Sequence, residues 1–229
     1  GVLIDPNVPV TAGIVQALYT QALGHAPSQA TLNGWLTSGL SVAQAFQAMV
    51  TSQSYFATTQ LAIEQYLTTA ANNSAGLPNS TITASAADVT PIQLNTIYEA
   101  VLQRAPTANE VTASLALDST TGNAAMIAAL VNAPEAVANV YPILQMFNLA
   151  FGYFPGAATL ASMVETGLTL PQLAAAVVGS QTFANVYNGG TLLNANAPVT
   201  AGIVEALYSQ ALGHAPSQAT LNGWLTSGL

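Results

Sequence analysis

The chain has 229 residues, 51% of them hydrophobic but only 4% charged, and its formal net charge is −8 at pH 7. One arginine, no lysine and no cysteine exclude a nucleic-acid-binding surface, a disulfide framework and a thiol nucleophile, and two histidines are too few for a zinc cluster. Small polar residues, Gly or Pro interrupt every apolar run short of the roughly 18 to 20 residues that a bilayer span needs. We therefore expect no cofactor, no nucleic acid and no membrane insertion.

Residues 1–40 recur as residues 190–229, with 33 of 40 positions identical at an offset of 189 residues. Because a cloning artefact would give an exact copy, we interpret this recurrence as a natural tandem array. A shorter pattern recurs within the period, in which an aromatic residue is followed after four residues by Leu or Phe and after four more by Pro. It occurs as Tyr19, Leu23, Pro27; as Tyr98, Leu102, Pro106; as Phe147, Phe151, Pro155; and as Tyr208, Leu212, Pro216. Each period therefore holds three related but unequal units.

The first unit is expected at residues 1–70 and consists of four short helices. Gly24 closes the opening helix, and Ser28 caps the next one. A last helix begins near Ser52, with Phe56 facing the core. The buried stripe of the second helix is expected to be Leu32, Trp35 and Leu36.

Residues 71–89 are predicted to form a linker loop, because they are rich in Asn, Ser, Thr, Gly and Pro and show no helical period. Two N-x-[ST] sequons, at Asn72 and Asn79, are candidates for glycosylation. An unmodified polar loop is the favoured interpretation.

The second unit is expected at residues 90–140 and the third at residues 141–188. Capping boxes begin at Thr90 and Thr107 in the second unit. Its opening helix carries an apolar stripe of Leu94, Ile97, Tyr98, Val101 and Leu102. In the third unit, Phe183 is expected to correspond to Phe56. Residues 189–229 begin the next period.

These elements predict an all-α fold, a tandem array of short four-helix units with one longer polar linker. The residues expected to pack the units and join copies are Tyr19, Leu23, Trp35, Phe56, Tyr208, Leu212 and Trp224.

Few residues carry candidate chemistry. Arg104 is expected to be a structural hub for carbonyls at the end of a helix, with an anchor for an acidic glycan as the alternative. His25 and His214 occupy one repeated position, and an imidazole bonded to backbone carbonyls is favoured over a metal ligand. Glu99 and Glu110 are interpreted as solvated helix positions rather than an acid/base pair.

Trp35 and Trp224 also stand at one repeated position. Packing in the core is favoured for them over stacking on a sugar ring.

The motif Leu18-Tyr19-x-x-Ala22-Leu23-Gly24-His25-Ala26-Pro27-Ser28, with Trp35 and Ser52-x-x-x-Phe56 after it, resembles the small α-helical domain of unknown function repeated in secreted bacterial RTX-type and S-layer proteins. Arg104 stands at the Arg position of that family, where the other units have His25, Tyr153 and His214. The resemblance implies export by a type I system and a place at the cell surface, with no known catalytic activity.

The leading hypothesis is a structural protein of the extracellular space or the bacterial cell surface, which assembles with other copies of itself into a filament, stalk or S-layer. The alternative is an anchor module that binds a cell-surface carbohydrate or lipopolysaccharide, and an enzyme is not expected. Residues 190–229 should need a neighbour to complete their core. With a single arginine to pair with nine acids, we expect stability to change little between about pH 7 and pH 3.

Overall fold

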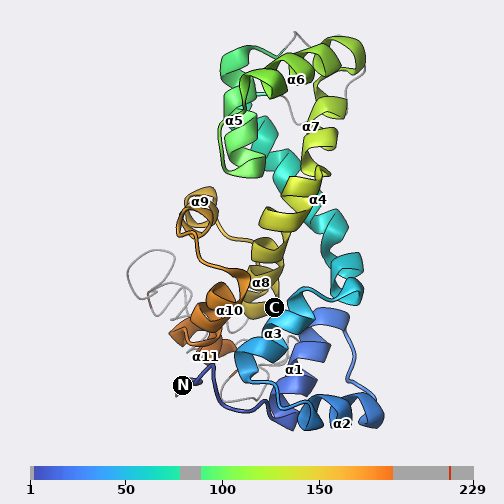
Figure 1. Cartoon of the computed structure of the whole chain (residues 1–229), viewed down its shortest axis with the longest axis vertical. Coiled ribbons are helices and arrows are strands. Elements are labelled where there is room, and N and C mark those ends of the chain that lie inside the picture. Colours follow the sequence, from blue (N-terminus) through green and yellow to red (C-terminus); the bar gives the residue numbers. More distant parts are fainter. Residues whose placement is uncertain (1–2, 78–88, 188–216, 218–229) are drawn as a thin grey trace. The chain divides into compact units, whose positions relative to one another are not determined.

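A computed structural model describes residues 3–77, 89–187 and 217. Across these residues it contains eleven α-helices and one π-helical turn (Figure 1). The described ranges have no strand, and the only β contact in them is an isolated antiparallel bridge between Pro9 and Ser41. The all-α prediction is confirmed.

The described chain begins with four α-helices, two of which start at the predicted caps Ser28 and Ser52. They are α1 (Ala12–Leu23), α2 (Gln29–Thr37), α3 (Val42–Val50) and α4 (Gln53–Ala75). The side chains of Ser28 and Ser52 each accept a hydrogen bond from a backbone N–H in the first turn of their helix. Gly24 closes α1 at a φ of 75°, a left-handed conformation that glycine adopts without cost.

The next group holds α5 (Pro91–Leu102), α6 (Ala108–Thr121), α7 (Asn123–Val131) and the π-helical turn η1 (Ala136–Val140). Both predicted capping boxes are present, at Thr90 with Gln93 and at Thr107 with Glu110. η1 leads directly into α8 (Tyr141–Phe151). It is followed by α9 (Ala157–Glu165), α10 (Leu170–Val178) and α11 (Gln181–Tyr187).

Helix boundaries in residues 24–52 recur 128 residues later. The paired positions are Gly24 and Gly152, Ser28 and Gly156, Gly39 and Gly167, Ser41 and Thr169, and Ser52 and Ser180. Packing recurs as well. α1 contacts α2, α3 and α4; α5 contacts α6, α7 and η1; and α8 contacts α9, α10 and α11.

The core joins segments that lie far apart in the sequence. α3 packs along α10, and the Phe46 and Phe183 rings meet edge to face, with centroids 5.5 Å apart. Tyr55 of α4 and Tyr187 of α11 donate their hydroxyls to the backbone oxygens of Gln145 and Leu149 in α8. Leu149 is among the last four residues of α8, whose carbonyls lack partners within the helix. Side chains from two other helices therefore hold α8 in the core.

The predicted start of the linker at residue 71 was wrong, because α4 continues to Ala75. Ala71 and Ala75 are buried one turn apart, and α4 packs along α5. The helix ends at Gly76, with a φ of 65°, and Leu77 N–H donates to the Asn72 carbonyl. Burial of these alanines explains why a polar stretch stays helical. The rest of the predicted linker, residues 78–88, lies outside the described residues.

Two predicted core positions are corrected. Leu36 is 41% exposed, so the buried stripe of α2 is narrower than expected. In α4 the fully buried aromatic residue is Tyr55, whereas Phe56 is half-buried and stacks on Tyr141 at 6.0 Å. Phe183 follows Ser180 by three residues, as Tyr55 follows Ser52, so Phe183 corresponds to Tyr55.

One helix end carries strain that its relatives avoid. Gln103 closes α5 at a φ of 59°, where the matching positions after α1 and α8 hold Gly24 and Gly152. A non-glycine residue in the left-handed conformation costs about 1 to 2 kcal/mol, which a glycine would avoid. Part of this gain in stability is offset because glycine loses more conformational freedom on folding. We expect Gln103→Gly to raise the free energy of unfolding by about 0.5 kcal/mol. Urea titration of both chains measures this, and a loss of stability would contradict it.

No single helix in the described residues is long and apolar enough to cross a membrane, and one bent pair, Asn123–Val131 with Ala136–Phe151, reaches the required length and composition only together. The chain divides into two units, Gly1–Thr191 and Leu192–Leu229. All described residues except Ser217 lie in the first. The predictions for Tyr208, Leu212, His214 and Trp224 fall outside the described residues.

Candidate functional site

Arg104 lies at the corner between α5 and α6, where it binds two carboxylates. Its guanidinium contacts Glu110 at 2.7 Å and 3.0 Å, and its Nε donates to Glu135 at 2.6 Å. The Tyr98 ring lies below it, 5.8 Å from the guanidinium carbon to the centroid. The planar fork of Arg matches the two oxygens of each carboxylate. Arg104 therefore ties the start of α6 to the segment just before η1.

The predicted role of Arg104 as a hub for carbonyls needs correction, because its main partners are acids. A carbonyl, that of Ala105, accepts one of its bonds at 3.0 Å. Glu110, interpreted from sequence as solvated, is instead bound by Arg104 and by the Thr107 backbone N–H at 2.7 Å. Glu99 is exposed, as expected, and its carboxylate accepts a hydrogen bond from the Asn95 side chain.

The hydrogen bonds from Arg104 hold the pKa of Glu110 at about 2, aided by the Thr107 backbone N–H. They also lower the pKa of Glu135, which lies on the other side of the guanidinium. A carboxylate bound by a cation and a backbone donor stays ionised to a lower pH than a free one. The cluster of Arg104, Glu110 and Glu135, here called the arginine cluster, is therefore fully charged at neutral pH.

The arginine cluster predicts a measurable cost for Arg104→Ala. The Arg104 side chain is 34% exposed, so solvent screens its ion pairs with Glu110 and Glu135. We therefore expect Arg104→Ala to lower the free energy of unfolding by about 1 to 2 kcal/mol. Arg104→Lys keeps the charge but not the fork and should lose less. Denaturant titration of both variants at low and high salt measures these losses. An unchanged midpoint for Arg104→Ala would show that the arginine cluster does not stabilise the fold.

The same cluster changes the expected response to acid. A carboxyl whose pKa is lowered on folding stabilises the fold above its unfolded pKa, and this contribution disappears as the pH falls through the folded pKa. For Glu110 that window runs from an ordinary value near 4.5 down to about 2. We expect the melting temperature to stay level from pH 7 to about pH 5 and then to fall. Circular dichroism melts measure this, and Arg104→Ala should flatten the slope below pH 5.

His25 follows α1 in the chain, and Trp35 lies on α2. His25 is exposed, and its Nδ1 lies 3.0 Å from the Ala26 carbonyl oxygen, the type of contact that was expected. Trp35 is half-buried and meets Tyr19 edge to face, and its indole N–H donates to the Tyr19 hydroxyl at 3.1 Å. In the second helix group, the Tyr98 and Ser114 hydroxyls are hydrogen-bonded at 2.9 Å, across the same 16-residue spacing as Tyr19 and Trp35. Leu23, the last residue of α1, is half-buried.

Among residues 3–77 and 89–187, His and acidic side chains form no group of three or more that could hold a metal ion. Asn72 lies in α4, half-buried, so this sequon is in a helix rather than in the predicted loop. Asn79 lies outside the described residues.

A groove that the sequence did not indicate lies between α4 and the turn before α9, with a volume of about 530 Å³. The Tyr66 and Phe154 rings are 5.2 Å apart in its wall, and the Tyr66 hydroxyl donates to the Pro155 carbonyl at 2.7 Å. Gln65 and Thr69 also line it. Tyr66 and Pro155, which meet in this groove, are 89 positions apart in the sequence, so no local sequence pattern could have revealed the groove.

Comparison with known proteins adds no identity: no family model matches the chain, and neither a curated protein nor a solved structure is significantly similar to it.

Proposed function

We propose that the chain is a structural repeat protein of the extracellular space or the bacterial cell surface, in which four-helix units stack in tandem and copies associate head to tail. The observation that carries this proposal is the recurrence at two scales. Forty residues return after 189 with 33 identities, and the helix caps of residues 24–52 return after 128. In repeat proteins each unit buries its apolar face against its neighbours, so identical joints extend an array.

The packing supports four helices as the repeating unit. In each group the first helix contacts the other three, and the third contacts the fourth, as in α3 with α4, α7 with η1, and α10 with α11. η1, the last element of the second group, leads directly into α8, so these two neighbouring units are joined without a loop. This continuity suits a protein that extends by adding units.

The surface supports association with copies of the same chain. Only 4% of the residues are charged, so few charged groups lose water when copies meet, and salt at physiological ionic strength screens the repulsion from the net charge of −8. Large apolar side chains are exposed along the described residues: Leu3, Val8, Leu36, Leu61, Ile92, Tyr153 and Leu168. The absence of Lys and Cys and the motif resemblance favour the cell surface.

Negative-stain electron microscopy of the purified chain tests the proposal. We expect linear or lattice-like assemblies with a regular repeat at tens of micromolar protein. Uniform single particles over the whole concentration range would contradict it.

The alternative function, binding of a cell-surface glycan, is supported by the groove at Tyr66 and Phe154. Aromatic rings beside amide and hydroxyl groups are suited to sugar rings. A glycan array with the unchanged chain and Phe154→Ala tests this, with Trp35→Ala as the control. Binding lost only in Phe154→Ala would place the glycan in this groove.

A further inference from the structure

One surface of the described unit is covered by a segment whose sequence occurs twice in the chain. Residues 3–40 pack on α3, α4 and α8, and we call the faces of these three helices the acceptor surface. Residues 190–229 repeat residues 1–40 almost completely. Residues 190–229 can replace residues 1–40 on this surface only if they keep the side chains and backbone groups that contact it.

Seven of the eight buried side chains of residues 3–40 are identical in the repeat, and the eighth is replaced by another aliphatic side chain. Identical residues stand at the buried positions Val10, Ile14, Val15, Ala17, Leu18, Ala22 and Leu32. The remaining buried position, Ile4, has Leu193 as its counterpart, which is also aliphatic and of the same size. Swaps of this kind usually cost less than about 1.5 kcal/mol. The apolar face that covers the acceptor surface is therefore present twice.

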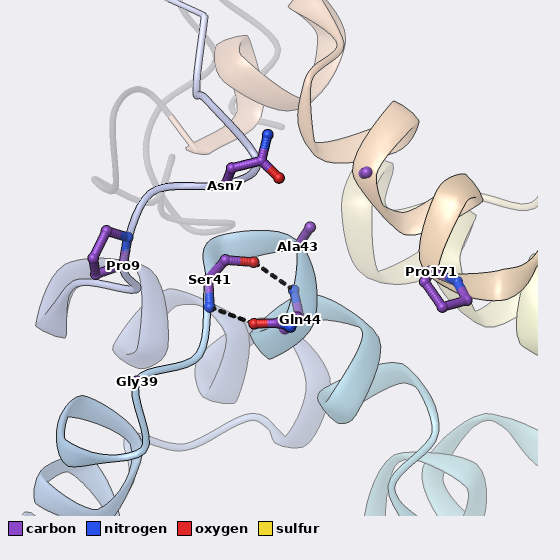
Figure 2. Close-up of a pocket in the computed structure, with 8 residues that line it drawn as sticks. Asn7, Pro9, Gly39, Ser41, Ala43, Gln44 and Pro171 are labelled. Atoms are coloured by element: carbon purple, nitrogen blue, oxygen red, sulfur yellow. Dashed lines mark hydrogen bonds between the residues drawn. The ribbon is translucent and has the colours of Figure 1, made fainter.

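Two of the differences fall at residues whose backbone carbonyls accept hydrogen bonds from the start of α3. Val42 N–H donates to the Val8 carbonyl, and Ala43 N–H donates to the Pro6 carbonyl, both at 3.0 Å. The repeat has Ala at the positions of Pro6 and Val8, which leaves both carbonyls in place. Figure 2 shows this end of the acceptor surface, where Asn7 and Pro9 lie beside the capping box of Ser41 and Gln44.

The other described differences keep the atoms that make hydrogen bonds. The Asp5 carboxylate accepts from the Asn7 N–H at 2.9 Å, and its counterpart Asn194 also has a side-chain oxygen. The Thr20 hydroxyl donates to the Gln16 carbonyl at 2.9 Å, and its counterpart Ser209 keeps a hydroxyl. Gln16 itself is exposed, so its replacement by Glu205 changes no buried contact.

We propose that residues 190–229 of a second copy of this chain bind the acceptor surface in place of residues 1–40, so that copies exchange this segment head to tail. The inference rests on the proposed self-assembly and names its partner segment. The contacts between copies would repeat those within one chain, so exchange gains no new contacts. Its equilibrium therefore depends on the entropy difference between a segment linked to the same chain and a segment supplied by another copy. Each exchange leaves another acceptor surface and another donor segment, so it propagates along a filament.

Paired aspartate substitutions at equivalent positions test the exchange. Leu18 is 1% exposed, and Leu207 stands at the same position in the repeat. Leu18→Asp should prevent a chain from covering its own acceptor surface, so residues 190–229 of another copy should take its place. We expect the melting temperature of Leu18→Asp to stay within about 3 °C of that of the unchanged chain, and its mass in light scattering to be at least twice that of a single chain. The double variant Leu18→Asp, Leu207→Asp should melt about 10 °C lower than the unchanged chain.

Leu207→Asp alone should keep the melting temperature of the unchanged chain and lose its association, and Gln16→Asp controls for the added charge on an exposed position of α1. A Leu18→Asp chain that melts as low as the double variant, or that stays stable as a monomer, would overturn the exchange. Association undiminished in Leu207→Asp would also overturn it while the proposed assembly stands. An unchanged chain that is monomeric, beside a stable and associated Leu18→Asp, would support the exchange and overturn the assembly.

Discussion

Phe46→Ala is expected to lower the free energy of unfolding by about 3 to 5 kcal/mol, the usual cost of removing a fully buried aromatic ring. Phe46 is 0% exposed on α3, and its ring meets Phe183 of α11 edge to face. The contact joins helices more than a hundred residues apart in the sequence. We therefore expect the whole described unit to unfold in one transition that shifts as a unit, measured by urea titration with fluorescence and circular dichroism together.

Phe56→Ala is the matched control, because Phe56 is half-buried on the neighbouring helix α4 and should cost less than Phe46→Ala. A double-mutant cycle with Phe183→Ala should give a coupling of about 0.5 to 1.5 kcal/mol between the two rings. Two separate transitions, with only one shifted by Phe46→Ala, would mean that the helix groups fold independently.

Asp118→Ala is expected to cost about 1 to 3 kcal/mol, because it removes the acceptor of a buried donor. Asp118 is 5% exposed on α6, and its Oδ2 accepts the backbone N–H of Val89 at 2.7 Å. Val89 precedes the cap of α5 and is itself buried. The bond therefore fixes the entry to the second helix group.

Hydrogen exchange at the Val89 amide measures this directly. We expect protection to be lost in Asp118→Ala and largely kept in Asp118→Asn, whose side-chain oxygen can still accept the bond. Equal protection in both variants would show that Asp118 does not hold this segment.

Local signals in the sequence predicted most helix starts. A side-chain cap and the residues that it bonds lie within one turn, so Ser28, Ser52 and Thr90 could be assigned without tertiary information. The continuation of α4 to Ala75 was missed because its stability comes from two alanines packed toward α5, which a polar composition conceals. Tyr55 and Phe56 are adjacent aromatic residues, so the sequence pattern alone leaves open which of them faces the core.

The candidate sites depended on contacts between distant residues. Arg104 stood out because it is the only cation, but its partner Glu135 lies 31 residues away and follows two intervening helices. The groove at Tyr66 and Phe154 likewise joins separate helix groups. Composition could therefore single out Arg104, whereas only tertiary packing defines what it binds.

Sedimentation velocity on the 229-residue chain and on the same chain shortened after Asn188 tests the central claim, head-to-tail assembly of helical units. We predict that the longer chain sediments as concentration-dependent oligomers at tens of micromolar, because residues 190–229 repeat the sequence of the segment that covers the acceptor surface and are proposed to bind it in another copy. The shortened chain should sediment nearly as a monomer. A monomeric 229-residue chain at the same concentration would contradict the account.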